Sequence, residues 1–152
     1  MTFKGFFELL TARDLLAKLE RDLVRAQNSP LDVDAAFDFF VTAYHMLDWL
    51  HPGVANRHKR DEIEKNSMLL QVASHLANGS KHFEATARKH QSVYETVKRE
   101  GPFQADAFQQ NAFDVGDLVV YLEGDAAAQF GRSINVVDLA RRLVDFWRQE
   151  LK

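Results

Sequence analysis

The residues best suited to chemistry in this sequence lie near its middle, in the stretch HLANGSKHFEAT (75–86). Asn78, Lys81 and His82 place an amide, an ammonium and an imidazole within one short stretch, where an amphipathic helical pattern ends. Two interpretations are open. Asn78 followed by Gly79 is a common way to end a helix, and the polar residues after it would then be solvated. Alternatively, these side chains form the polar centre of a site.

A second row of polar side chains runs along the preceding helical segment, residues 31–50. Its members recur every three or four residues between two apolar rows: Asp38, Thr42, His45 and Asp48. His75 and Asn78 form a similar line on the next helix. A short connection joins the two helices, so we expect them to lie antiparallel and adjacent. The two polar lines would then face each other and form a binding region, with His45 or Asp48 near Asn78 or His82.

A metal site is a weaker alternative for the same residues. Asp48 and His51 share a helical face, and an ion between them and His75 or His82 is conceivable. However, the sequence has no Glu-x-x-His repeat and no His-Glu-x-x-His motif. It also has no cysteine, which excludes disulfides, thiolate zinc sites and cysteine nucleophiles. We therefore expect neither a metal nor another cofactor.

Several common catalytic motifs are missing from the sequence. It contains no G-x-x-x-x-G-K-[ST] phosphate loop, no G-x-G-x-x-G between a strand and a helix, and no G-x-S-x-G elbow. These absences lower the expectation of nucleotide hydrolysis, dinucleotide redox chemistry and ester hydrolysis.

The stretch ANGSKH (77–82) resembles the R-N-x-x-x-H signature of the HEPN superfamily (higher eukaryote and prokaryote nucleotide-binding domains), many of which are ribonucleases. Asn78 and His82 match the signature, whereas Ala77 stands where the family has arginine. The resemblance covers mainly the first 83 residues and the last helix. It implies a helical bundle that dimerises and acts on RNA without a metal.

The resemblance also implies roles for individual residues. His82 would be the general acid or base, Asn78 would orient it, and Lys81 would offset phosphate charge. Because Ala77 lacks the guanidinium that clamps phosphate, we expect weak or no RNA cleavage. An arginine at position 77 is expected to raise that cleavage.

Length and composition agree with one globular domain spanning residues 1–152. The chain has a formal net charge of −3 and 46% hydrophobic residues, an ordinary globular composition. No apolar run approaches the length of a membrane span, and the first residues do not resemble a signal peptide. We therefore expect a cytoplasmic protein without membrane contact. Residues 57–99 are rich in Lys and Arg, which permits an anionic partner such as RNA or a nucleotide.

Hydrophobic periodicity predicts the elements that position these residues. Helices are expected over about 3–27, 31–50 and 61–78, with Ser29 and Pro30 starting the second one. Strands are expected at 92–98 and 116–124, and residues 107–114 are a further candidate to pair with either. A short helical turn at 126–130 and a last helix capped by Asn135 complete the chain.

These observations predict a mainly α (α+β) fold, an HEPN-like helical bundle with a small antiparallel β insertion at about 90–125. The resemblance to the HEPN superfamily implies an RNA- or nucleotide-directed protein of a defence, prophage or toxin–antitoxin type. It would be a symmetric homodimer whose interface includes the second and third helices. The alternative is a non-enzymatic dimeric module that binds a protein partner through the exposed edge of its sheet.

Overall fold

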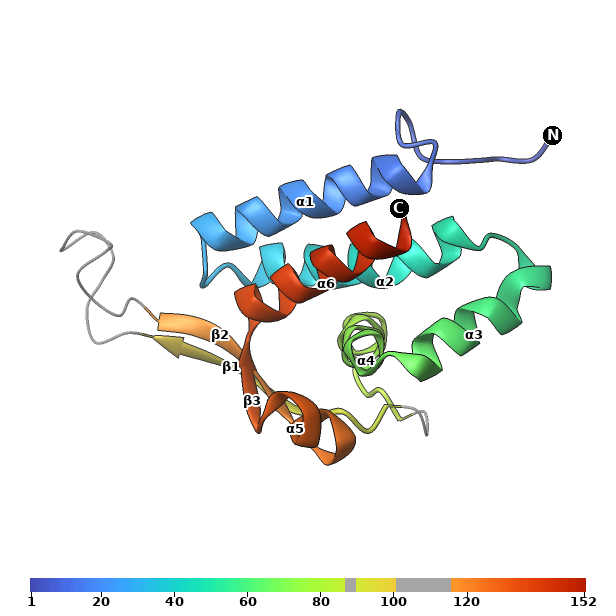
Figure 1. Cartoon of the computed structure of the whole chain (residues 1–152). Coiled ribbons are helices and arrows are strands. Elements are labelled where there is room, and N and C mark those ends of the chain that lie inside the picture. Colours follow the sequence, from blue (N-terminus) through green and yellow to red (C-terminus); the bar gives the residue numbers. More distant parts are fainter. Residues whose placement is uncertain (87–89, 101–115) are drawn as a thin grey trace.

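The computed structural model describes residues 1–86, 90–100 and 116–152, and these are mainly helical with a small three-stranded antiparallel sheet (Figure 1). In chain order the elements are α1 (Ala12–Asn28), α2 (Val33–Leu50), the 3-10 turn η1 (Val54–Asn56), α3 (Arg57–Asn66), α4 (Met68–Lys81), β1 (Val93–Glu100), β2 (Gly116–Leu122), α5 (Gly124–Phe130), β3 (Ser133–Asn135) and α6 (Val136–Glu150). The expected α+β class is confirmed.

The first helix begins later than its apolar pattern predicts. Thr11 caps α1 by accepting a hydrogen bond from the backbone N–H of Asp14, whose carboxylate in turn accepts from the backbone of Thr11. Before this cap, backbone hydrogen bonds between Phe6 and Leu9 close a tight turn, and Phe7 adopts a positive φ of 50°. Residues 3–11 are therefore not helical, because the capping box sets the helix start at Ala12.

The second helix occupies the expected residues, but its cap differs from the prediction. Asp32 accepts a hydrogen bond from the backbone N–H of Ala35 at 3.0 Å, and α2 begins at Val33. Ser29 ends α1 instead, and the chain turns through Pro30 before α2 starts. The prediction that Ser29 and Pro30 open the second helix is wrong.

The single third helix predicted over 61–78 is two helices. α3 ends at Asn66, and Ser67, in an extended conformation, separates it from α4. The Ser67 hydroxyl accepts a hydrogen bond from the backbone N–H of Leu70 and caps α4. At the other end, α4 continues through Asn78 and Gly79 to Lys81, so the predicted break at Gly79 is absent.

The strands predicted at 92–98 and 116–124 are both present, as β1 and β2. β1 and β2 pair antiparallel with a register shift between Val93 and Glu95, and β2 also pairs with β3, in the order β1-β2-β3. The sequence did not indicate β3, which has only three residues. The third predicted strand segment, 107–114, lies outside the described residues. Asn135 caps α6 as expected, since its side chain accepts from the backbone N–H of Val137.

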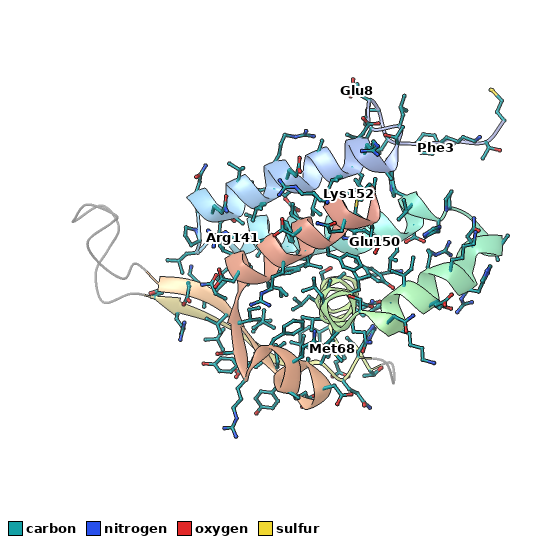
Figure 2. The ribbon with its side chains drawn as sticks, viewed as in Figure 1. Phe3, Glu8, Met68, Arg141, Glu150 and Lys152 are labelled. Atoms are coloured by element: carbon teal, nitrogen blue, oxygen red, sulfur yellow. The ribbon has the colours of Figure 1, made fainter. Side chains whose placement is uncertain are left out.

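The helices enclose one core centred on Trp147 of α6. Trp147 is fully buried, and its indole N–H donates to the carbonyl of Ala43 in α2 at 3.0 Å. α1, α2 and α6 run side by side, whereas α4 is seen end-on and crosses beneath them (Figure 1). The side chains that fill this interior are drawn in Figure 2. Within the described ranges, no helix is both long and apolar enough to span a membrane.

Candidate functional site

The polar row of α2 does not face α4, which corrects the expected shared site. Asp38 forms an ion pair with Arg25 of α1 at 2.7 Å. Thr42 accepts a hydrogen bond at 2.9 Å from Lys18 of α1. The Lys18 ammonium also forms an ion pair with a carboxylate on α1. These two side chains therefore join α2 to α1. The polar row does not face α4 because α4 crosses α2 along an apolar face of α2.

The remaining members of that row lie elsewhere. Asp48 pairs with Arg60 of α3 at 3.2 Å, and the same guanidinium donates to the carbonyl of His51. His45 is exposed on α2. Over residues 1–86, 90–100 and 116–152, no three His, Asp or Glu side chains lie close enough together to hold a metal ion. The Asp48 carboxylate thus orders the turn from α2 into α3.

Asn78, Lys81 and His82 are neighbours at the carboxyl end of α4, but they do not converge. Asn78 donates to the carbonyl of Ser74 at 2.8 Å, along its own helix. Lys81 and His82 are exposed, and His82 lies just beyond the last helical residue. A helix carboxyl end carries partial negative charge, which opposes phosphate binding. Lys81 supplies the positive charge at this point.

Ala77 is buried in α4, with only 7% of its surface exposed. An arginine at this position would have to place its guanidinium inside the protein or distort the helix packing. The expectation that an arginine here would restore a phosphate clamp therefore conflicts with the packing. Position 77, where the HEPN signature has arginine, is a buried core position in this chain.

His75 anchors the start of β1 to α4. Its Nδ1 accepts hydrogen bonds from the backbone N–H of Val93 at 3.0 Å and of Ser92 at 3.4 Å. The imidazole stacks on His90, with ring centroids 5.2 Å apart. Burial lowers the pKa of His75, and Glu123 only partly opposes this effect. The residue expected to bind a ligand therefore holds a strand in place.

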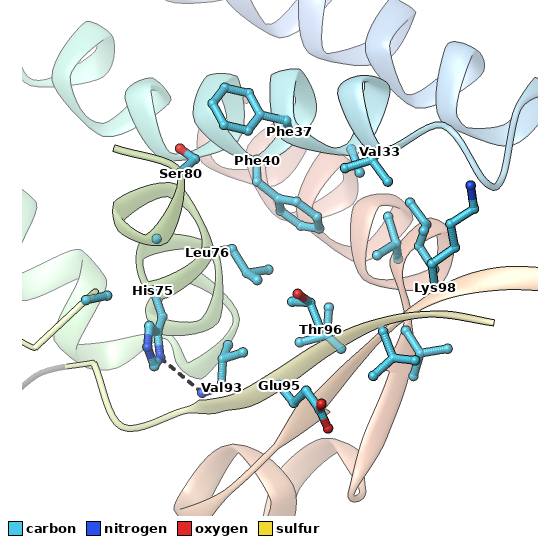
Figure 3. Close-up of a pocket in the computed structure, with 18 of the residues that line it drawn as sticks. Val33, Phe37, Phe40, His75, Leu76, Ser80, Val93, Glu95, Thr96 and Lys98 are labelled. Carbon is cyan, nitrogen blue, oxygen red and sulfur yellow. Dashed lines mark hydrogen bonds between the residues drawn. The ribbon is translucent and has the colours of Figure 1, made fainter. Parts of the chain in front are cut away.

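A groove of about 580 Å³ lies between β1, α2 and α4 (Figure 3). α2 contributes Val33, Phe37 and Phe40 to one wall, and α4 contributes Leu76 and Ser80. The other wall is β1. The sequence pattern did not reveal this groove, because the apolar row of α2 that includes Val33 and Phe37 predicts burial. Phe37 is instead 49% exposed.

β1 lies at one end of the sheet order, so its second edge has no partner strand among the described residues. Residues along β1 line the groove successively from Val93 to Lys98. Phe83, just after α4, also lines the groove and is fully exposed. An open strand edge thus lies beside exposed apolar side chains. Such a combination suits an added strand, whose backbone the edge would pair and whose side chains the groove would cover.

Comparison of this chain with family models, with curated proteins and with solved structures gives no match. The groove, the strand edge and the end of α4 are therefore the features of the molecule from which a function can be inferred.

Proposed function

We propose that this chain is a non-enzymatic interaction module that binds another polypeptide as a strand added beside β1. The observation that carries the proposal is the open edge of β1 next to the groove. Backbone hydrogen bonds would supply affinity, and the apolar wall formed by Val33 and Phe37 would favour partners with apolar side chains facing it. A cytoplasmic location, expected from the sequence, is part of this proposal.

The second candidate is RNA-directed activity of an HEPN-like protein. It is supported by the exposure of Lys81 and His82, which adjoin each other at the end of α4. It is weakened by the direction of Asn78 along its own helix and by the burial of Ala77. Asp38 and Thr42, which would complete its site, pair with α1 instead. We therefore rank it below the interaction module.

The test uses purified protein and three fluorescent probes, with anisotropy as the readout. The probes are a peptide of alternating threonine and valine as long as β1, the same peptide with a central proline, and a single-stranded RNA. We expect the first peptide to bind and the proline peptide to fail, because proline removes a backbone donor from the added strand. RNA should not be retained at low salt, and RNA turnover in EDTA should be absent.

Phe37→Asp should abolish peptide binding, since it places a carboxylate on the apolar wall without disturbing a buried position. Phe3→Asp is the matched control, because Phe3 is also exposed and lies at the N-terminal end, away from the sheet (Figure 2). Circular dichroism confirms that each variant is folded. Equal binding of both peptides, or binding unchanged in Phe37→Asp, would overturn the proposal. If the native chain retains or cleaves RNA, and Lys81→Ala and His82→Ala lose that retention or cleavage, the second candidate is supported instead.

A further inference from the structure

The two faces of β1 carry different side chains. Residues directly opposite in an antiparallel pair share a face, and Thr96 lies opposite Val120, which belongs to the core under the helices. The register with β2 is continuous from Glu95 to Glu100, so side chains alternate regularly over this stretch. Thr96 and Lys98 therefore face the helices. Figure 3 shows Lys98 directed toward α2 and Glu95 away from it.

Two charged side chains of β1 are available to a partner strand, one on each face. Glu95 is exposed and forms no ion pair within the described ranges. Lys98 lies 3.9 Å from Glu100, beyond hydrogen-bonding distance, and because both side chains are exposed this contact contributes little. Arg99 differs, since two hydrogen bonds of 2.8 Å join its guanidinium to Asp117 of β2. Its charge is compensated within the chain.

The apolar wall of the groove adds a third feature. Val33 and Phe37 of α2 line the groove and are 54% and 49% exposed. A partner side chain opposite Thr96 would point toward the helices, because opposite residues share a face. An apolar side chain at that position would enter the groove and remove part of this wall from water.

These three features together set the order of side chains in an antiparallel partner. Such a strand runs in the direction opposite to β1, so the residue facing Lys98 comes first and the residue facing Glu95 comes three positions later. Complementary charge requires an acidic residue at the first of these positions and a basic residue at the last. The residue facing Thr96 immediately precedes the basic one and is apolar.

We propose that the strand bound beside β1 carries the pattern acidic–any–apolar–basic and lies antiparallel to β1, with the acidic residue facing Lys98 and the basic residue facing Glu95. This inference rests on the proposed function and names the class of polypeptide that it binds. The two charges stand three positions apart and therefore project from opposite faces of the bound strand, as the two charges of β1 do.

Two peptides of identical composition test the order of charges. Both derive from the alternating threonine–valine peptide, with the central sequence changed to Glu-Thr-Val-Lys in the first and to Lys-Thr-Val-Glu in the second. Because their net charge is the same, general attraction to the protein does not separate them. In anisotropy the first should bind about tenfold more tightly, since the second sets like charges opposite both Lys98 and Glu95. Added salt should reduce the difference.

The second peptide also reports on the direction of the strand. Bound parallel to β1, it would match both charges but would turn threonine toward the groove and valine away from it. An affinity equal to or greater than that of the first peptide would therefore contradict the antiparallel arrangement.

Exchange of the two charges in the protein should reverse the preference. The double variant Glu95→Lys with Lys98→Glu keeps the net charge and alters only exposed side chains. It should bind the Lys-Thr-Val-Glu peptide more tightly than the other. The matched control is Lys59→Glu with Glu62→Lys, which exchanges exposed charges three residues apart on α3 and should keep the native preference. Circular dichroism confirms that both variants are folded.

The outcomes separate this inference from the proposed function. If the threonine–valine peptide binds but the native chain does not prefer the Glu-Thr-Val-Lys peptide, the inference is overturned and the function stands. If the variant with exchanged charges on β1 keeps the native preference, these charges do not select the partner, and the inference is again overturned. A protein that binds no strand peptide overturns both.

Discussion

His75 shows how a single side chain links two elements in this protein. It projects from α4, and its Nδ1 accepts the backbone N–H groups at the start of β1. A ring nitrogen can accept these bonds only when it carries no proton. The position of the edge strand is thus coupled to the protonation state of one imidazole.

This coupling predicts a dependence of stability on pH. Burial lowers the pKa of His75 below its ordinary value of 6.5. Below that pH the unfolded chain takes up a proton that the folded chain does not, so the unfolded state binds more protons there. The stabilising contribution is therefore complete above about pH 6.5 and is lost as the pH falls below it.

We expect His75→Gln, which can still accept a hydrogen bond, to reduce this dependence. The free energy of unfolding is measured with urea between about pH 7.5 and 5.5 for the native chain and the variant. The native chain should lose more stability over this interval than His75→Gln. His45→Gln, at an exposed histidine on α2, is the control for loss of an imidazole. Parallel curves for the native chain and His75→Gln would contradict the role given to Nδ1.

At the scale of elements, caps decide where the helices begin. Thr11, Asp32, Ser67 and Asn135 each accept a backbone hydrogen bond at the start of a helix. The apolar periodicity of a helix continues through neighbouring residues and does not mark these points. Ser67 in particular separates α3 from α4, and the direction of α4 follows from that break.

The start of α2 gives a matched pair of substitutions. Asp32→Ala should lower the free energy of unfolding by about 1 kcal/mol, because the backbone N–H of Ala35 loses its acceptor. Ser29→Ala should change it little, since the contacts of Ser29 at the end of α1 are made by its backbone. Urea unfolding followed by circular dichroism measures both. A greater loss from Ser29→Ala would mean that the cap has been assigned to the wrong residue.

At the scale of the whole molecule, one core joins the helices to the sheet. The buried cluster includes residues of α1, α2, α4, α6 and β2, and Trp147 binds α6 to α2 at its centre. Among the residues that the structure describes, no separate apolar cluster supports the sheet alone. We therefore predict that residues 1–152 unfold as one cooperative unit.

The prediction is tested with two probes of the same urea titration. Far-ultraviolet circular dichroism follows the backbone. Tryptophan fluorescence follows the core through Trp147, which is buried in it, and Trp49, which packs against it. The two curves should have the same midpoint and slope. A sheet that unfolds separately would give circular dichroism a second step that fluorescence lacks.

The sequence by itself determined the features that depend on local pattern. A run rich in β-branched residues predicted β1, and a compact apolar run bounded by glycines predicted β2. The dense apolar rows predicted α2, and Asn135 predicted the start of α6. These predictions are correct because side-chain periodicity and helix capping depend on residues that are close together in the sequence. The α+β class follows from them.

Only the tertiary structure decided which elements those patterns meet. Asp38 and Thr42 pair with α1 because α4 crosses α2 on another face, and a helix crossing depends on side chains distant in sequence. For the same reason Ala77 entered the core, His75 became the anchor of β1, and Phe37 remained exposed beside an open strand edge. Periodicity says which side of a helix is apolar, but the partner across that side is set by the packing of the whole chain.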